Sequence, residues 1–401
     1  MFAVFNQPSA TTSNEVDTID SFLLDAFRCT EVSTRVRGSV DKGWDEDFTP
    51  RLEDIATVRK LLLQLVTGQS GQDIPAVVQD FFGSIERGIA EPVDPDGFVN
   101  HLKFFCFNAL EFARLEEMHP NFVVGPRVAE TGPALYLASA NISEEIKHNA
   151  AVLVPITEDI RLKLRGYWND LHSEYEELAN RSVGGGGTIV NFLTELWESL
   201  TGDSGDSEPD DRFDTIHSDQ CKLYFYPRIS GIDTIVNVLE NIEHSRRHVD
   251  SPCTVRLVTP RFRDSRVAVA KALEVLHGNG ARIEVVTRSQ DDFFGDPPKP
   301  ELGHRVAEIL GRCAYLYFQR SNDGMNIHSK YLLVDAPYTS KGDFVRQKLV
   351  WHGTANMTSS GIDSHWEMLM KLYEGTGAYD AFLQDFEFLK SNAASLASEP
   401  E

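Results

Sequence analysis

The chain has 401 residues, of which 41% are hydrophobic, so it can bury a substantial core, and its length predicts two or three domains. No apolar run approaches the ~20 residues of a membrane span, so we expect no integral membrane segment. The formal net charge of -23 argues against general binding of DNA or RNA, because an acidic surface repels a polyanion.

The first residues, MFAVFNQPSA, lack the basic start and the long apolar stretch of a secretory signal, which predicts a cytoplasmic protein. A secreted protein in its mature form would have the same appearance. The cysteines are odd in number, widely spaced and never arranged as C-x-x-C. They predict reduced core thiols in place of a disulfide framework or a zinc site.

In chain order, the composition divides the sequence into two similar halves. We expect an N-terminal repeat (1–180), a flexible glycine-rich and acidic linker (181–214), a C-terminal repeat (215–395) and a disordered tail (396–401). Each half opens with an apolar strand, a proline turn and the triplet Asp-Thr-Ile at the start of an amphipathic helix. Strands then alternate with helices, which predicts an α/β fold with helices that cover a sheet.

Four matches in the same order support an internal duplication. Asp17 matches Asp233 at a separation of 216 positions, and Arg51 matches Arg266 at 215. The segment MHPNFVV, which starts at Met118, is matched with IHSKYLL, and ASANIS with GTANMT. Matches at nearly one offset are typical of repeated structural units.

Charged residues enter the apolar strand NIHSKYLLVD of the second half. His328 and Lys330 are two positions apart, so both side chains point to the same side of a strand, with about 7 Å between them along it. Two cationic groups at this spacing suit the oxygens of one tetrahedral anion. Their alternative role is that of charges on an exposed edge strand.

The segments that follow add further candidates. Gly353, Thr354 and Ala355 are small and would let a ligand approach the backbone, and Asn356 offers an uncharged hydrogen-bond donor. Glu367 is a lone acid in an apolar strand and could hold an imidazole in one tautomer.

These residues resemble the phospholipase D superfamily, specifically its bacterial two-repeat members. HSKYLLVD and GTAN match the family pattern His-x-Lys-x-x-x-x-Asp followed by Gly-Ser/Thr-x-Asn at every defined position. The resemblance implies two phospholipase D-like repeats, each a mixed β-sheet flanked by helices, related by a pseudo-twofold axis. It also implies a chemistry that needs no metal and no cofactor, in which one histidine attacks phosphorus and the other protonates the leaving alcohol. Asp335 is expected to support the motif and not to touch substrate.

The first half departs from the family pattern in the segment HPNFVVGP. It keeps a histidine, His119, but has Asn121 at the lysine position and Pro126 at the aspartate position, so half of the usual charge is missing. Asn121 and Asn141 can still donate neutral hydrogen bonds to a phosphate. We expect His328 to be the nucleophile and His119 the general acid and base, with the reverse assignment left open.

Two classes of function remain at this point. The first is a phosphodiesterase or phosphatidyl or phosphoryl transferase, monomeric, that acts on a phospholipid or a small phosphodiester; a nuclease of the same superfamily is its alternative. The second is an inactive phospholipase D-like binding module. Two basic segments, HSRRH from His244 and PRFRDSR from Pro260, are candidates for a local basic patch, with ordinary solvated charges as the other interpretation.

Overall fold

The computed structural model describes most of both predicted repeats. The described residues are 1–6, 18–40, 48–67, 99–100, 102–125, 130–139, 148–168, 215–218, 220–226, 233–289, 293–294, 299–319, 326–340, 343–358, 365–393 and 395–398. The predicted linker, 181–214, lies outside these residues. Within them, no helix has the length and apolar character needed to span a membrane.

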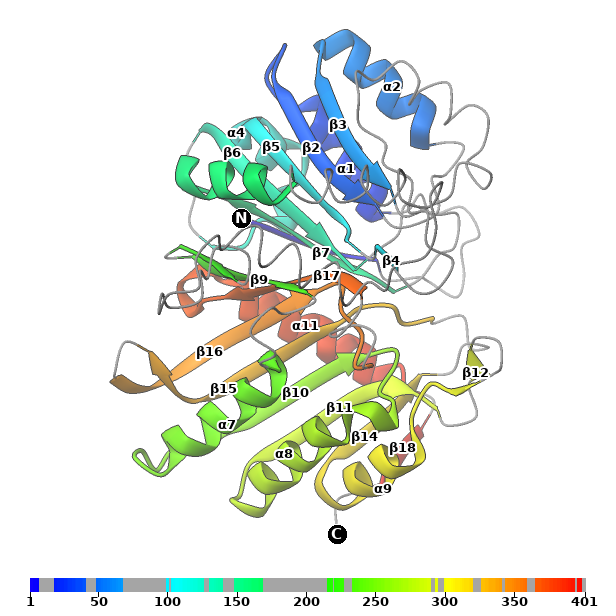
Figure 1. Cartoon of the computed structure of the whole chain (residues 1–401), viewed down its shortest axis with the longest axis vertical. Helices are drawn as coiled ribbons and strands as arrows, with labels where there is room; N and C mark the ends of the chain where they lie inside the picture. Colours follow the sequence, from blue (N-terminus) through cyan, green and yellow to red (C-terminus); the bar gives the residue numbers. More distant parts are fainter. Residues whose placement is uncertain are drawn as a thin grey trace, which may run out of the picture.

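The N-terminal repeat contains a six-stranded mixed sheet (Figure 1). Its strands lie in the order β1 (Phe2–Phe5), β7 (Ala150–Pro155), β6 (Thr131–Ala138), β5 (Phe104–Glu111), β2 (Arg35–Val40) and β3 (Leu62–Thr67). Only β2 and β3 are parallel neighbours, as expected when a helix connects two adjacent strands. That helix is α2 (Phe48–Arg59).

The C-terminal repeat contains a longer sheet with the same central order. Its strands lie in the order β18 (Ser395–Ser398), β14 (Tyr315–Gln319), β11 (Arg282–Arg288), β10 (Thr254–Thr259), β15 (Tyr331–Ser340), β16 (Asp343–Gly353), β17 (His365–Leu372), β9 (Cys221–Tyr226) and β8 (Thr215–His217). The run from β9 through β17, β16, β15 and β10 to β11 repeats the order of the first sheet strand for strand. This agreement confirms the predicted pair of similar mixed sheets. A separate two-stranded sheet pairs β12 (Phe293–Phe294) with β13 (Lys299–Pro300).

Helices cover the outer face of each sheet. The outer helices are α1 (Thr18–Arg28), α2 and α4 (Phe112–Met118) in the first repeat, and α7 (Thr234–Arg246), α8 (Val267–Gly278) and α9 (His304–Cys313) in the second. Three short 3₁₀ helices are η1 (Pro120–Phe122), η2 (Asp264–Arg266) and η4 (Glu374–Thr376). The carboxylate of Asp233 accepts hydrogen bonds from the N–H groups of Ile235 and Val236, so the predicted Asp-Thr-Ile signal does start a helix.

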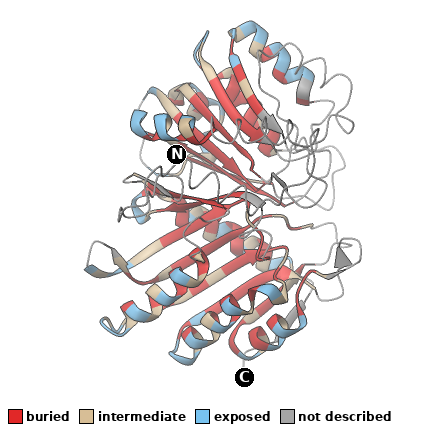
Figure 2. Cartoon of the chain, in the orientation of Figure 1, coloured by how far each residue is buried: buried red, intermediate tan, exposed pale blue. Residues whose placement is uncertain are grey.

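Side chains that alternate along the strands divide the core into three parts. In β5, Phe105 and Phe107 face the outer helices of the first repeat, whereas Phe104 and Cys106 join a central core. This central core takes residues from both sheets and from helix α11 (Ala378–Ser391), which contacts β1 of the first sheet and β15 and β16 of the second. Figure 2 shows that the strands are mostly buried and that the outward faces of the helices carry exposed residues. The two repeats are therefore joined by a shared apolar interior.

Each repeat also pairs its backbone with the other. In one direction β17 pairs with β4 (Val99–Asn100), with Trp366 opposite Asn100. In the other, His148 forms a bridge with Ile327. The second contact joins the same two positions as the first, with the two repeats interchanged. A pseudo-twofold relation predicts such reciprocal contacts.

The predicted tail is partly wrong. Residues 395–398 form β18, which pairs antiparallel with β14 in place of the disorder expected from 396 onward. Backbone hydrogen bonds to an open sheet edge order this short polar segment although its side chains are small.

Candidate active site

The predicted His-x-Lys segment lies where the two repeats meet. The N–H groups of His328 and Ser329 both donate to the carbonyl oxygen of His148, at 2.8 and 2.9 Å. The Nζ of Lys330 donates to the carbonyl oxygen of His328 at 2.7 Å. The motif is therefore docked on the N-terminal repeat immediately before β15 begins.

A side chain of the first repeat orients the His328 ring. The Nδ1 of His328 lies 3.0 Å from the Oδ1 of Asn149. Because an amide oxygen only accepts, Nδ1 carries the hydrogen of this contact, and in the neutral imidazole the lone pair then lies on Nε2. This is the tautomer that a nucleophilic imidazole needs.

Burial and neighbouring cations act together on Lys330, whose side chain is almost completely enclosed. Burial lowers its pKa well below the ordinary value, and the positive charge of Lys103 lowers it further, whereas Glu367 raises it. Lys103 is also buried and belongs to the first repeat. Two lysines, one from each repeat, thus act on the same small region, which favours a bound anion.

The small residues at the end of β16 and just after it also have structural roles. A Cβ on Gly353 would overlap the carbonyl oxygen of Met368, so glycine is required by the close approach of β17 and not by a ligand. The hydroxyl of Thr354 accepts a hydrogen bond from the N–H of Met368 at 3.0 Å. Asn356 is different, since its Oδ1 is buried without a hydrogen-bond partner among the described residues. Of these three, Asn356 is the one whose side chain has hydrogen-bonding capacity left for substrate.

The equivalent of Lys330 in the first repeat is Lys103. The N–H of Gly353 donates to the carbonyl oxygen of Lys330, and the N–H of Ala138 donates to that of Lys103, at 3.3 and 3.0 Å. Strands β5 and β6 pair in the same register as β15 and β16 directly after these residues. The first repeat therefore carries the motif His101-Leu102-Lys103, with Asn108 at the aspartate position. His101 itself lies outside the described residues.

Comparison with known proteins finds a match in the second repeat. Residues 242–389 match the family model described as cardiolipin synthase, PLD-like domain. The matched region, which lies in the second repeat, is thus similar to the PLD-like domains of the phospholipase D superfamily. A search of curated protein sequences found no significant match.

Two solved structures of known proteins share the fold. Phosphatidylserine synthase from Haemophilus influenzae Rd KW20 has 11% identity and a TM-score of 0.59, with 98% of this chain and 86% of that chain covered. Polyphosphate kinase from Porphyromonas gingivalis has 12% identity and a TM-score of 0.51, with 97% of this chain covered. This phospholipase D-like chain spans half of the length of that kinase. At these identities the likeness concerns the fold.

The structure does not bring His119 to the superfamily motif of the second repeat. The Nε2 of His119 bonds the Oδ2 of Asp25 on α1 at 3.0 Å, and its ring packs against Phe22 and Phe122 on the outer side of the first sheet. The segment after it pairs with the start of β1, where Val123 lies opposite Phe2.

Asn149, by contrast, lies at the other end of β1, since the N–H of Asn6 donates to its carbonyl oxygen. At about 3.3 Å per residue, the length of this strand separates His119 from the residue that binds His328. The predicted match of MHPNFVV with IHSKYLL was therefore wrong, and Asn121 is an exposed residue of η1.

The physical reason is an insertion. In the second repeat β15 and β16 form a hairpin, with Ser340 opposite Asp343. In the first repeat the equivalent strands β5 and β6 are separated by residues 112–130, which hold α4, η1 and His119. An H-x-K spacing is present in the segment NHLKFFCFN, which forms β5 from Phe104 onward.

Other predicted residues are placed as follows. Glu367 is fully buried on β17, near enough to Lys330 to affect its pKa. The carboxylate of Asp335 accepts a hydrogen bond from the Nε of Arg346 at 2.7 Å, five positions along β15 from Lys330, in line with a supporting role. The second-repeat motif of this phospholipase D-like chain is thus gathered at one place. Asn141 lies outside the described residues, although the register of Ala138 with Gly353 confirms that its segment matches GTAN.

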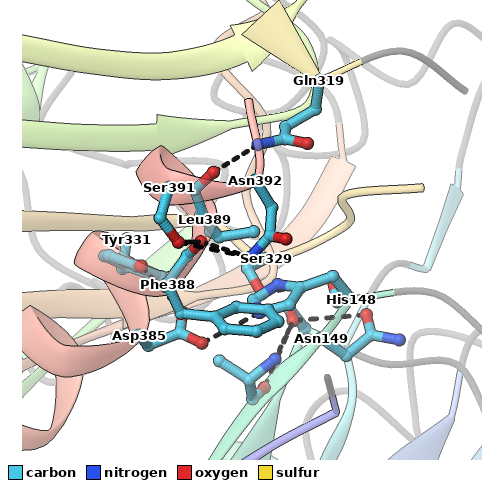
Figure 3. Close-up of polar contacts among 12 residues, drawn as sticks. His148, Asn149, Gln319, Ser329, Tyr331, Asp385, Phe388, Leu389, Ser391 and Asn392 are labelled. Atoms are coloured by element: carbon cyan, nitrogen blue, oxygen red, sulfur yellow. Dashed lines mark hydrogen bonds and ion pairs between the residues drawn. The ribbon is translucent and has the colours of Figure 1, made fainter. Parts of the chain in front are cut away.

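A buried polar network lies next to the motif and includes its Ser329 (Figure 3). The imidazole of His148 bonds the hydroxyl of Ser329 through Nδ1 at 3.0 Å and the Oδ1 of Asp385 through Nε2 at 2.9 Å. The hydroxyl of Tyr331 donates to the Oδ2 of Asp385 at 2.8 Å. His148 and Asp385 are both fully buried. Helix α11 is thereby connected through His148 to the backbone of His328, a connection that sequence inspection did not suggest.

The equivalent positions in the first repeat follow from the strand registers. Leu102 takes the place of Ser329, and Trp366 that of His148. The polar network is therefore specific to the motif of the second repeat, which makes the two halves of this phospholipase D-like site chemically different.

Proposed function

We propose that the chain is a phosphodiesterase or a phosphatidyl or phosphoryl transferase in which His328 attacks phosphorus. The observation that carries the proposal is the His328 ring, which Asn149 of the other repeat holds through Nδ1, in the region of the two buried lysines Lys103 and Lys330. A nucleophile, its orienting group and cations for the phosphoryl oxygens are then present together.

The partner histidine in this proposal is His101, by its place in the motif His101-Leu102-Lys103. The strand registers make position 367 equivalent to position 149, because Gly353 pairs with Leu369 and Ala138 pairs with Ala151. Asn149 of the first repeat binds His328 of the second repeat. By the same relation we expect Glu367 of the second repeat to be the partner of His101 of the first. A carboxylate partner stabilises an imidazolium, whereas a neutral amide partner does not. We therefore assign His101 as the proton donor and His328 as the nucleophile.

The reaction proceeds in two displacements. The Nε2 lone pair of His328 forms a bond to phosphorus, the bond to the leaving alcohol oxygen breaks, and that oxygen takes the proton of the His101 imidazolium. Water or an acceptor alcohol then gives a proton to His101 and attacks the phosphohistidine, which releases the His328 nitrogen. Lys103, Lys330 and Asn356 would bind the phosphoryl oxygens as negative charge develops.

The test uses bis(4-nitrophenyl) phosphate and acid-free mapping of the covalent adduct. We expect wild type to release 4-nitrophenol and His328→Gln to reduce the rate by 10³-fold or more, as is usual for a removed nucleophile. Rapid quenching should trap a 4-nitrophenyl phosphoryl group on the peptide that contains residue 328. His119→Gln is the matched control and should remain within about threefold of wild type. An adduct on residue 101 would overturn the assignment of the nucleophile. Binding of phosphate without turnover would overturn the reaction and favour the inactive binding module.

The acidic surface favours a phospholipid or a small phosphodiester over long nucleic acid as substrate. A nuclease of the same superfamily is the alternative. Comparison of kcat/KM for a short-chain phosphatidylcholine, bis(4-nitrophenyl) phosphate and a single-stranded oligonucleotide distinguishes them, since a nuclease would prefer the oligonucleotide.

A further inference from the structure

The first repeat holds an arginine, Arg37, at the position that Arg256 occupies in the second. Ser39 of β2 pairs with the first residue of β5, and Val258 of β10 pairs with the first residue of β15. Arg37 and Arg256 each lie two positions before these residues in their strands, and the two sheets share the same central strand order. The two arginines are therefore equivalent.

An aromatic ring lies next to each of the two guanidiniums. Arg37 lies over the ring of Trp168, 5.9 Å from its centre, and Arg256 lies over the ring of Phe386 at 5.8 Å. Trp168 belongs to the helical residues 158–168 after β7, and Phe386 belongs to α11 after β17. Because these surroundings agree, the groups that bind the two arginines can be compared position by position.

The acid that binds Arg256 is replaced by an amide in the first repeat. Arg256 pairs with Glu284 of β11, whose carboxylate accepts a hydrogen bond from the Nε of Arg256 at 2.9 Å. In the same register, Arg37 pairs with Gln64 of β3. Glu284 is 1% exposed. The second repeat therefore balances its arginine with a buried negative charge, whereas the first repeat offers a neutral side chain.

Arg37 lies among other arginines. It is 7% exposed, and its Nε has no hydrogen-bond partner in the described parts of the chain. Burial lowers the pKa of Arg37 from 12.5 to about 10, and the charges of Arg35, Arg165 and Arg161 lower it further. The Nε of Arg35 and the Oε1 of Gln64 are likewise buried without a hydrogen-bond partner among the described residues.

A single carboxylate accompanies these four arginines. Within the residues that the structure describes, only Arg161 forms an ion pair, and its partner is Glu158. An enclosed guanidinium with unused donors is costly unless an anion binds it. The arrangement around Arg37 therefore favours a bound anion in the place that the carboxylate of Glu284 takes in the second repeat.

The arginines lie apart from the candidate active site. Arg37 pairs with Cys106, which follows Lys103 by three positions, about 10 Å along the chain. Val36, the neighbour of Arg37 in β2, faces the outer helices, so the Arg37 side chain points to the inner face of the sheet. An anion bound to Arg37 would thus not occupy the place of the scissile phosphate.

We propose that Arg35, Arg37 and Arg165 bind a small anion of the phosphate class on the inner face of the first sheet, beside the helical residues 158–168. Phosphate suits this place because its oxygens match the paired donors of guanidinium groups and its charge offsets more than one cation. The amide of Gln64 can donate to the same anion, whereas a carboxylate there would repel it. The inference does not depend on the proposed function.

The test measures binding of inorganic phosphate to the full chain by calorimetry, with Gln64→Glu as the main variant. The new carboxylate should bind Arg37 as Glu284 binds Arg256, so we expect the affinity of this site for phosphate to fall about tenfold or more. The midpoint temperature of unfolding without phosphate should rise. Val58→Glu adds the same charge at a 77% exposed position of α2. It is the matched control and should leave the phosphate affinity unchanged.

Arg37→Gln provides a second variant, and thermal unfolding verifies that it is folded. We expect it to lose about tenfold or more in phosphate affinity as well, because the most buried donor of the site is removed. An unchanged phosphate affinity in both Arg37→Gln and Gln64→Glu would overturn the site. Tighter binding of acetate than of phosphate to wild type would overturn the assignment to the phosphate class.

Two further comparisons identify the source of the phosphate and separate this site from the proposed reaction. Glycerol 3-phosphate that binds more tightly than inorganic phosphate, and loses affinity in Gln64→Glu, would identify a phosphorylated small molecule as the ligand. The reverse order of affinities would identify free phosphate. His328→Gln should retain the binding that Gln64→Glu weakens, and its loss in His328→Gln would overturn the separate site. Absence of turnover in wild type would contradict the proposed function alone.

Discussion

At the scale of single residues, the chemistry of the site depends on what accepts the Nδ1 hydrogen of His328. A neutral amide, Asn149, occupies this position, whereas the equivalent position in the other repeat holds Glu367. The proposed division of labour between the two histidines follows from this single difference, because a carboxylate raises the pKa of an imidazole and an amide does not.

Exchange of Asn149 for aspartate tests this view. In Asn149→Asp the new carboxylate should stabilise the imidazolium of His328 and raise its pKa by about one unit or more. Since the nucleophile must be neutral, the acidic limb of the pH profile of kcat/KM should move upward by a similar amount. Asn237→Asp adds the same charge on the exposed face of α7 and should leave the limb in place. A limb that stays where it is in Asn149→Asp would contradict the assignment of His328 as nucleophile.

Another residue-scale prediction concerns His352, a fully buried histidine on β16 whose Nε2 lies 3.4 Å from the carbonyl oxygen of Leu137. Burial lowers its pKa from 6.5 to about 4. Between these values the unfolded chain binds the proton and the folded chain does not, so the free energy of unfolding falls as the pH is lowered.

The decrease in the free energy of unfolding that is due to His352 should reach about 2.5 kcal/mol at pH 4.5 relative to pH 7.5. This value follows from about 1.4 kcal/mol per pKa unit. Urea unfolding of wild type and His352→Gln at both values measures it, because glutamine can still donate to Leu137 but does not titrate. Equal losses in the two proteins would show that His352 is protonated in the folded chain.

At the scale of elements, helix α11 combines two functions. Its apolar residues Phe382, Phe386 and Leu389 are fully buried in the central core. Its Asp385 accepts hydrogen bonds from Tyr331 and His148. The helix therefore connects the packing of the two repeats to the backbone position of the His328 motif.

Removal of the Asp385 carboxylate should affect both functions. In Asp385→Ala the buried donors of His148 and Tyr331 lose their acceptor, and we expect the free energy of unfolding to fall by about 3 kcal/mol. The kcat should fall about tenfold, with KM less affected, because the motif loses its support while the cations remain. Asp380→Ala, on the same helix but exposed, is the control and should stay within about 0.5 kcal/mol of wild type. Urea unfolding and steady-state kinetics give both readouts. A tenfold increase in KM at constant kcat would instead indicate a role in binding.

At the scale of the whole molecule, a cationic site lies within a chain of formal net charge -23. The distant acidic surface should repel an anionic substrate at low ionic strength, whereas the local cations attract it at contact. Salt screens the distant charges first, since the Debye length falls from about 30 Å at 0.01 M to about 10 Å at 0.1 M.

We therefore expect kcat/KM for an anionic diester to rise between about 10 and 100 mM salt and to fall at higher concentration, where local contacts are screened too. Steady-state rates over a series of sodium chloride concentrations measure the profile, and an uncharged viscogen controls for diffusion. A steady decrease of kcat/KM from the lowest salt concentration onward would mean that the electrostatic potential around the site is already positive.

The comparison of sequence and structure is instructive at two places. The order of strands and helices and the match of ASANIS with GTANMT could be derived from the sequence, because hydrophobic periodicity and a short motif are local properties. The register of the motif in the first repeat could not be derived from the sequence. Equivalent residues are 227 positions apart at Lys103 and Lys330 but 215 apart at Ala138 and Gly353, owing to the insertion that contains α4. For this reason, matching the two halves of the sequence at a nearly constant separation selected His119.

By itself, the sequence determined the duplicated α/β architecture and the intact second motif, since these depend on residue types at fixed short spacings. Only the tertiary structure decided which first-repeat residues join that motif. Asn149 and His148 reach it through pairing between positions more than 170 residues apart, and helix docking adds Asp385 of the second repeat. Contacts of this kind depend on the shared core between the repeats, and no local pattern in the chain encodes them.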